Sequence, residues 1–509
     1  MAHKELFLEL RDHLSPDMIY VRELLIGRYR AAPFRKGFNM TKVRREHDLL
    51  GEREVPIDAY YGIHTVRAVE NFAITGVRIG HYPDLIAALA AVKEAAATTN
   101  MRLGLLDPRL GNAIVAACEE VRAGKLHDQF VVDVVQGGAG TSTNMNANEV
   151  IANRALEILG FQKGDYDTLH PNEHVNMSQS TNDVYPTSVK IAAYWGINHL
   201  IAALNILRSA FAHKADEFSD YLKIGRTQLQ DAVPMTLGQE FGTYAVMMEE
   251  DEARLEGVQR LICEVNLGAT AIGTGINAHP EYAAMVCTEL CLVTAIPLVT
   301  ARNLIEATQD CGVFVQLSGI LKRVAVKLSK ICNDLRLLSS GPRAGLNEIN
   351  LPAVQGGSSI MPGKVNPVIP EVVNQVAFEV IGNDLTITFA AEAGQLQLNA
   401  FEPIIAYSLF KSLRHLTEAC LTLKRRCVPG ISANKERLRE TVENSIGLAT
   451  ALNPYIGYKA ATALALEAQA TGKGVHQLVI EKKLLPPERI EEILRPEVLA
   501  NATISRQRK

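Results

Sequence analysis

Aromatic residues are scarce in this chain of 509 residues: only 6% are Phe, Tyr or Trp, and Trp195 is the single tryptophan. β-Sandwich proteins draw heavily on aromatic side chains, so this shortage argues against that fold class. Small and aliphatic residues are abundant instead, and this composition favours long helices. Hydrophobic residues make up 47% of the chain, which is enough for a large core and excludes general disorder.

An excess of one charge, a long apolar run and closely paired cysteines are also absent. The 52 Lys and Arg residues nearly balance 56 Asp and Glu residues, which argues against nucleic acid or a membrane surface as a partner. The apolar run Leu85–Val92 is among the longest, and it is far shorter than the roughly 20 residues of a membrane span. None of the eight cysteines lies in a CxxC motif, so we expect no disulfides and a cytoplasmic protein.

Composition divides the chain into four regions, and a prior of roughly 150 residues per domain predicts about three domains. The four regions are residues 1–46, 47–185, 186–430 and 431–509. The first is a basic extension with three interpretations: a flexible arm, an organelle transit segment, or residues upstream of the true start. Acids in its first half argue against a transit segment, and we expect a loosely ordered extension without a catalytic role.

The second region mixes helices with polar loops, and the fourth is a small helical region. The third region contains four segments of more than 25 residues each, with apolar side chains at three- and four-residue spacing and few helix breakers. Such segments predict a mainly α fold built on a bundle of long helices. Apolar residues occupy more than one face of these segments, so we expect the bundle to bury itself against other copies of the chain.

Four polar loops carry residues suited to binding a small anion. Residues 355–367, QGGSSIMPGKVNP, can direct several backbone N–H groups at one point, while Lys364 adds a positive charge. The other three loops are residues 141–144, 178–182 and 226–228, all dense in hydroxyl, amide or guanidinium groups. Each alone could simply cap a helix. Together they predict a cradle for a small carboxylated molecule, and their separation along an elongated bundle indicates that several subunits contribute.

The spacing of His170 and His174 suggests a pair of metal ligands. Pro171 lies between them, so they do not share the face of a regular helix. We interpret both as structural and predict no metal site.

These loops resemble the signature segments of the aspartase/fumarase superfamily of lyases and, within it, those of the aspartases. The resemblance rests on GSSIMPGKVNP, VNMSQSTNDVYPT, GRTQLQDAVPMTLGQE and EVNLGATAIGTGINA, and it runs from about Leu49 to the C-terminal region. It implies a three-domain fold whose central long-helix bundle assembles into a tetrameric helical core, with active sites shared between subunits of a homotetramer. It implies no cofactor, and leaves divalent-cation activation open.

Class II fumarases are the nearest alternative, because they perform the same elimination with water in place of ammonia. Three stretches favour the aspartases. GGAGTSTNMN lacks a Gln that fumarases usually carry between the Thr and the Ser, Gln228 stands where fumarases carry His, and Val-Ile-Pro-Glu follows VNP in place of Thr-Gln. Glutamine is neither an acid nor a base, and an ammonium group leaves more readily than hydroxide. A non-catalytic protein that reuses the fold is the remaining alternative.

The resemblance implies reversible deamination of L-aspartate to fumarate and ammonia. Ser358 would be the base that removes a Cβ proton, giving a doubly charged aci-carboxylate intermediate that the site must stabilise electrostatically. A serine hydroxyl is a weak base at neutral pH, so closure of its loop would have to favour the deprotonated form. The residues that would bind substrate are Thr141, Ser180, Thr181, Asn182, Thr227, Gln228, Lys364 and Asn366.

Overall fold

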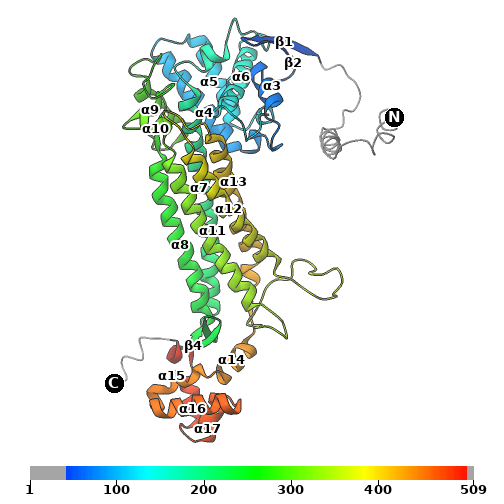
Figure 1. The fold of residues 1–509 in the computed structure, drawn as a ribbon, viewed down its shortest axis with the longest axis vertical. Coiled ribbons are helices and arrows are strands. Elements are labelled where there is room, and N and C mark those ends of the chain that lie inside the picture. Colours follow the sequence, from blue (N-terminus) through cyan, green and yellow to red (C-terminus); the bar gives the residue numbers. More distant parts are fainter. Residues whose placement is uncertain (1–41, 501–509) are drawn as a thin grey trace, which may run out of the picture.

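The computed structural model describes residues 42–500, and three helical regions follow one another along its longest axis (Figure 1). An N-terminal region lies at one end of a bundle of long helices, and a small C-terminal region lies at the other end. Most described residues are helical, and the strands form only two-stranded sheets. The predicted mainly α fold is therefore confirmed. No helix within residues 42–500 is long and apolar enough to cross a membrane.

The N-terminal region combines one antiparallel hairpin with short and medium helices. Its elements are β1 (Val43–Asp48), β2 (Gly51–Pro56), α3 (Ile63–Asn71), α4 (Pro83–Arg102), α5 (Pro108–Arg122) and α6 (Thr141–Ile158). Four elements from the middle of the chain complete this end: β5 (Glu264–Val265), α9 (Tyr282–Thr294), β6 (Val299–Thr300) and α10 (Leu304–Gln309). Helix α4 begins at a proline, Pro83. Proline suits the first helical position because it has no N–H to leave unpaired.

Strand β1 corrects the predicted extent of the N-terminal extension. Residues 1–41 lie outside the described residues, but Val43–Glu46 pair with β2 and are not loosely ordered. Arg44 and Glu46 are buried side by side, with 2.7 Å between Nε and Oε1. Arg44 also donates to the carbonyls of Ala59 and Tyr61, and these contacts hold the hairpin against the domain. The basic composition of the segment did not show that Arg44 is buried and donates hydrogen bonds to backbone carbonyls.

Five long helices form the bundle and run alternately up and down. They are α7 (Thr181–Glu217), α8 (Leu237–Ile262), α11 (Gly312–Leu338), α12 (Val368–Glu392) and α13 (Glu402–Arg426). The four predicted long segments correspond to α7, α8, α11 and α12, and α13 is the fifth helix. At the lower end lie β3 (Leu222–Thr227), β4 (Gln230–Thr236), β7 (Ile349–Asn350) and β8 (Ser432–Ala433).

Helix α7 begins earlier than expected, so the predicted boundary after residue 185 falls inside it. A capping box starts the helix. The Ser180 side chain accepts a backbone N–H of the first turn, and the Asp183 side chain accepts the backbone N–H of Ser180. Pro186 follows within the helix and cannot donate to the carbonyl of Asn182, four residues earlier. The Nδ2 of Asn266 donates to that carbonyl instead, at 3.1 Å. A side chain from another segment therefore satisfies the carbonyl that the proline leaves unpaired.

The small C-terminal region has a hydrophobic core of its own. Its helices are α14 (Lys435–Asn444), α15 (Gly447–Ile456), α16 (Tyr458–Thr471), α17 (Val475–Glu481), α18 (Pro487–Ile493) and α19 (Pro496–Leu499). Leu452, Leu464 and Leu478 are among the buried residues of that core.

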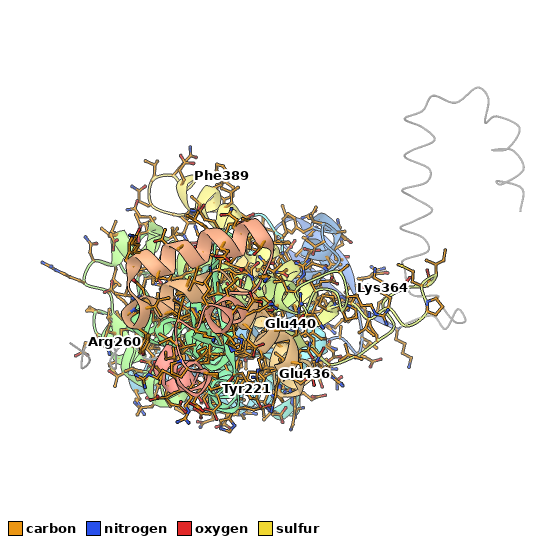
Figure 2. All side chains as sticks on the ribbon, turned by 90° about the horizontal axis from the view of Figure 1, so that it is seen from below. Tyr221, Arg260, Lys364, Phe389, Glu436 and Glu440 are labelled. Atoms are coloured by element: carbon orange, nitrogen blue, oxygen red, sulfur yellow. The ribbon has the colours of Figure 1, made fainter. Side chains whose placement is uncertain are left out.

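One face of α12 is apolar and exposed in the isolated chain. Phe378, Leu385 and Phe389 are 62%, 57% and 65% exposed, and Ile381 lies on the same face at helical spacing. Figure 2 shows Phe389 at the surface of the molecule. A stripe of this size on a water-facing helix is typical of a surface that another protein covers.

Glu402, the first residue of α13, is buried at the upper end of the bundle. It is only 4% exposed, and within residues 42–500 its Oε2 has no hydrogen-bond partner. Burial raises the pKa of Glu402 to about 8, and the nearby ammonium of Lys190 on α7 acts in the opposite direction. The native state therefore holds a proton on this carboxyl that the unfolded chain releases at lower pH.

Glu402→Gln tests this protonation. With the native pKa raised, the free energy of unfolding of the wild type should fall as pH rises from the usual range of a glutamate toward 8. The neutral variant should not show this fall in the free energy of unfolding. The difference in melting temperature, variant minus wild type, should therefore be larger at pH 9 than at pH 5. Glu436→Gln, on the exposed surface of α14, controls for the removed charge. An equal difference between Glu402→Gln and wild type at both pH values would contradict the assignment.

Candidate active site

The predicted site residues fall into two groups at opposite ends of the bundle. The upper group is Thr141, Ser180, Thr181 and Asn182, and the lower group is Thr227, Gln228, Ser358, Lys364 and Asn366. Helix α7 connects the two ends, and its 37 residues span about 55 Å at a rise of 1.5 Å per residue. One chain therefore brings together the members of each group but not the two groups.

The upper group lies at the N-termini of α6 and α7. Thr141 is the first residue of α6, and its Oγ1 donates to the carbonyl of Gly138 at 2.7 Å. Gly140 precedes it with φ of 89°, and a Cβ there would lie 2.4 Å from the ring of Tyr185, so only glycine fits. Ser180 caps α7, as its hydroxyl oxygen accepts from the N–H of Asn182 at 3.3 Å. Unpaired N–H groups at such helix starts favour anions.

Thr181 and Asn182 connect this helix start to neighbouring segments. The Oγ1 of Thr181 accepts from Nδ2 of Asn144 at 3.1 Å, and Asn182 donates through Nδ2 to the carbonyl of Ala271 at 2.7 Å. Thr181 is buried and Asn182 half-buried. In one chain, therefore, the amide of Asn182 already binds a backbone carbonyl, as a residue that shapes a turn would.

Two buried charges that the sequence interpretation missed lie beneath the upper group. The Nζ of Lys93 on α4 donates to Asn144 Oδ1, Asn176 Oδ1 and Gln179 Oε1 at 2.7, 2.8 and 2.9 Å. Asp183 accepts through Oδ2 from the N–H groups of Gly268 and Thr270 at 3.1 and 2.8 Å, which ties α7 to that loop.

Burial acts on the pKa values of both charges. It lowers the pKa of Lys93 to about 7 and raises that of Asp183 to about 6, and the opposite charge of each partner counteracts the shift of the other. A signal for Lys93 was present in the sequence. It stands in helical register with Leu89, Ala96 and other fully buried positions of α4, so its side chain had to point into the core.

The lower group includes the tip of the β3–β4 hairpin. Thr227 pairs with Gln230, so Gln228 and Leu229 alone make the turn, with φ of 53° and 63°. Two-residue turns of this kind usually contain Asn or Gly, because other residues are strained at positive φ. All three residues from Thr227 to Leu229 are exposed. Strain held in an exposed turn is typical of functional segments, which supports a role for Gln228.

A cluster of buried charges fixes the base of this hairpin. Glu348 is 1% exposed, and its carboxylate lies 2.5 Å from Nη1 of Arg226 and 3.2 Å from Nζ of Lys223. Lys223 also pairs with Glu240 of α8. Arg226 thus braces its loop, and the role of Glu348 was not foreseen from the sequence. Because Glu348 directly precedes β7 and residues 351–367, it links the hairpin to the segment that contains Ser358.

Ser358 lies in a loop that is closed by its own backbone. Its Oγ accepts from the N–H groups of Ile360 and Met361 at 3.2 and 2.9 Å. The Nδ2 of Asn366 donates to the carbonyl of Gly357 at 2.7 Å, and the N–H of Gly357 donates to the carbonyl of Lys364 at 2.8 Å. A Cβ on Gly357 would lie 2.7 Å from the carbonyl oxygen of Lys364 and 2.7 Å from the backbone N of Asn366, so the glycine permits the closure.

Lys364 is exposed at the far side of this loop. Figure 2 shows it well away from the body of the chain, where its ammonium group is directed at solvent. The upper group of hydroxyls is at the other end of the bundle.

Within residues 42–500, no group of three or more His, Cys, Asp or Glu side chains is placed to hold a metal ion. The ring nitrogens Nδ1 of His170 and His174 both accept backbone N–H groups, from Asn172 and His170 respectively, at 3.1 and 2.8 Å. All eight cysteines are free thiols, and all except Cys291 are buried.

Comparison with known proteins decides the family. Residues 51–382 match the lyase family model, and residues 448–501 match the model of the fumarase C C-terminus. Aspartate ammonia-lyases from Helicobacter pylori and Pseudomonas fluorescens are 58% and 61% identical over 455 residues, covering 89% of this chain and 97% and 95% of theirs. The chain is a member of the aspartate ammonia-lyase family. The aspartate ammonia-lyase of Escherichia coli K12 is 56% identical over 452 residues.

Solved structures share the fold of this chain. The fumarate lyase:delta crystallin of Brucella melitensis has a TM-score of 0.88 and 59% identity, covering 90% of this chain and 100% of that one. A class II fumarase from Schistosoma mansoni has a TM-score of 0.84 over a similar share, 90% and 99%, but only 36% identity. The predicted membership of the aspartase branch is confirmed, and the fumarases share the fold at lower identity.

Glu348→Gln tests the charge cluster in this aspartate ammonia-lyase family member. The substitution keeps the shape of the side chain but leaves Lys223 and Arg226 without their shared carboxylate, and breaking a buried pair costs roughly 3–5 kcal/mol. We expect a clear fall in the midpoint of chemical denaturation and faster proteolysis of the hairpin. Glu440→Gln, which removes a carboxylate from an exposed ion pair with Arg437, is the control and should change little. Equal effects of the two substitutions would exclude a clamping role for Glu348.

Proposed function

We propose that this protein catalyses the reversible deamination of L-aspartate to fumarate and ammonia. The observation that carries the proposal is the geometry of Ser358, whose Oγ receives two backbone N–H groups inside GSSIMPGKVNP, in a chain of the aspartate ammonia-lyase family. Two such donors would stabilise the oxygen when it is deprotonated, so it could act as the base that removes the Cβ proton. Relatives that are 61% and 56% identical to this chain are named aspartate ammonia-lyases.

The remaining predicted residues would bind the substrate and its intermediate. Removal of the Cβ proton makes the β-carboxylate an aci-carboxylate with two negative charges, which needs preorganised donors and positive charge. Thr141, Ser180 and Thr181 stand at two helix N-termini and would supply hydroxyl and N–H donors, with Asn182 beside them. Lys364 and Asn366 would supply a cation and an amide from the Ser358 loop.

Gln228, with Thr227, would contact the ammonium group or a carboxylate from the hairpin tip. An amide side chain cannot transfer protons to or from water, which suits a reaction that expels ammonia. The ammonium leaving group needs no acid once the carbanion has formed. This is the position at which the chain differs in chemistry from the fumarases that it resembles in fold.

We also propose a homotetramer in which different subunits supply the two groups of site residues. The 37-residue α7 keeps the groups apart within one chain, so antiparallel packing of bundles is needed to bring the upper end of one chain to the lower end of another. The exposed apolar face of α12, with Phe378, Leu385 and Phe389, would be buried by this packing. We propose a cytoplasmic enzyme that needs no cofactor, with cation activation left to experiment.

The activity assay is direct. Purified protein with L-aspartate should produce fumarate, seen as rising ultraviolet absorbance, together with an equal amount of ammonia. With L-malate in place of aspartate, little fumarate should form. Fumarate from malate but not from aspartate would assign the protein to the fumarase activity, and no product from either would make it a non-catalytic member of the family.

Ser358→Ala should abolish turnover while the oligomer remains folded. Loss of the general base should reduce kcat by about 10²–10⁴-fold. Ser359→Ala, one residue further in the same exposed loop, controls for disturbance of the loop and should lose far less activity. Size-exclusion chromatography of both variants checks assembly. A near-normal kcat for Ser358→Ala would remove this residue from the role of base.

Lys364→Ala should mainly raise the KM for aspartate. The ammonium is expected to pair with a substrate carboxylate, and a charged hydrogen bond of this kind contributes about 1.5–3 kcal/mol, which corresponds to a rise of roughly tenfold or more. A smaller loss in kcat should accompany it, because the negative charge grows in the transition state. Lys364→Arg keeps the charge and should recover part of the affinity. An unchanged KM for Lys364→Ala would place Lys364 outside the site.

A further inference from the structure

Lys93 is a fully buried ammonium whose hydrogen-bond partners are all side-chain amides. Its Nζ donates to the oxygens of Asn144, Asn176 and Gln179 at 2.7, 2.8 and 2.9 Å. An ammonium has three protons and a neutral amine only two, so three acceptors match the charged form. The Lys93 side chain is 0% exposed, so its ammonium group does not contact solvent. It lies beneath the upper group of site residues.

The ammonium determines how each of these amides is oriented. Because it cannot accept a hydrogen bond, each amide must turn its oxygen toward Lys93 and its NH2 group away. Gln179 then donates through Nε2 to the carbonyls of Val175 and Met177, both at 3.1 Å, and Asn176 donates through Nδ2 to the carbonyl of Gln179 at 3.2 Å. These bonds shape the segment that leads into Ser180.

The third amide acts on Thr181 itself. With its oxygen held by Lys93, Asn144 directs Nδ2 at Oγ1 of Thr181, 3.1 Å away. Among the described residues this is the one hydrogen bond that the Thr181 hydroxyl makes. The hydroxyl oxygen is therefore an acceptor inside the protein, and its proton is left to donate elsewhere. A carboxylate is an acceptor without protons of its own, so only a hydroxyl oriented in this way can bind it.

We propose that Lys93 is a positioning residue of the reaction: its charge sets the polarity of the amide network so that the Thr181 hydroxyl donates to a substrate carboxylate. This inference rests on the proposed function, because it takes the group that accepts the Thr181 proton to be a carboxylate of the dicarboxylate substrate. Lys93 does not touch the substrate and acts through Asn144. Without the ammonium, the Asn144 amide can rotate, present its oxygen to Thr181 and take the proton that the substrate needs.

A double-mutant cycle on fumarate binding tests the inference. Fumarate affinity is measured by titration calorimetry for wild type, Lys93→Met, Thr181→Val and the double variant. Lys93→Met should weaken fumarate binding about tenfold when Thr181 is present but less than about threefold when Thr181 is already valine, because the effects of coupled residues are not additive. Equal factors in both backgrounds, or no weakening at all, would overturn the role of Lys93.

A second variant keeps the test decisive if Lys93→Met does not fold. Asn144→Asp preserves the size of the side chain and its contact with Lys93, but replaces the Nδ2 donor, which serves Thr181 Oγ1 and Asn176 Oδ1, by an acceptor oxygen. The Thr181 proton should then turn inward, and fumarate affinity should fall about tenfold more than it does when the same substitution is made with Thr181 already valine, where only the added charge acts. Unchanged fumarate affinity in Asn144→Asp would overturn the proposal.

Lys190→Met is the matched control. Lys190 is a second buried lysine, and it donates to the backbone carbonyl of Glu264 at 2.7 Å and, within residues 42–500, to no side-chain amide. Its loss should lower thermal stability without any coupling to Thr181→Val. Turnover of aspartate by the wild type is measured separately. A wild type that binds fumarate without deaminating aspartate would overturn the proposed function alone, additive effects would overturn the Lys93 role alone, and a wild type that binds no fumarate would overturn both.

Discussion

Helix α7, with 37 residues, keeps the two groups of polar side chains at opposite ends of the chain. The helix begins among the upper group of site residues. It ends just before the hairpin that contains Thr227 and Gln228 of the lower group, about 55 Å away. A helix packed on both sides within a bundle cannot bend enough to close that distance. A reaction that needs both sets must therefore use more than one chain, and the exposed apolar face of α12 offers the surface on which chains would meet.

Each end of the bundle is prepared in the same physical way, by buried charges that hold polar loops in place. At the upper end Lys93 and Asp183 organise the segment around Ser180, and at the lower end Glu348 holds Arg226 and Lys223 beneath the hairpin. Buried charges are costly unless they are fully paired or hydrogen-bonded, so they fix one arrangement of the loops above them. At the lower end, residues 227–229 and 359–365 stay exposed, whereas at the upper end Thr181 is buried and its neighbours are half-buried.

Much of the fold could be predicted from the sequence, because apolar periodicity and helix-start signals are local. Pro83 marked α4, and the long segments marked α7, α8, α11 and α12. The start of α7 was missed, since the helix contains Pro186, and the Asn182 carbonyl that this proline leaves unpaired is satisfied by Asn266, more than 80 residues later in the chain. The polar loops were recognisable from composition, but no local pattern states which end of the molecule they occupy. Lys93 and Glu348 were missed because a single charge in a sequence does not disclose its partners.

Hybrid oligomers test whether one active site combines groups from different chains. One chain would have its lower group disabled by Ser358→Ala, and the other its upper group by Thr141→Val with Thr181→Val. Each pure oligomer should be inactive toward aspartate, while co-expressed chains should regain substantial activity, because sites that combine the intact upper end of one chain with the intact lower end of another become available. If hybrids that are shown to contain both chains stay as inactive as the pure oligomers, each site belongs to a single chain and the account is wrong.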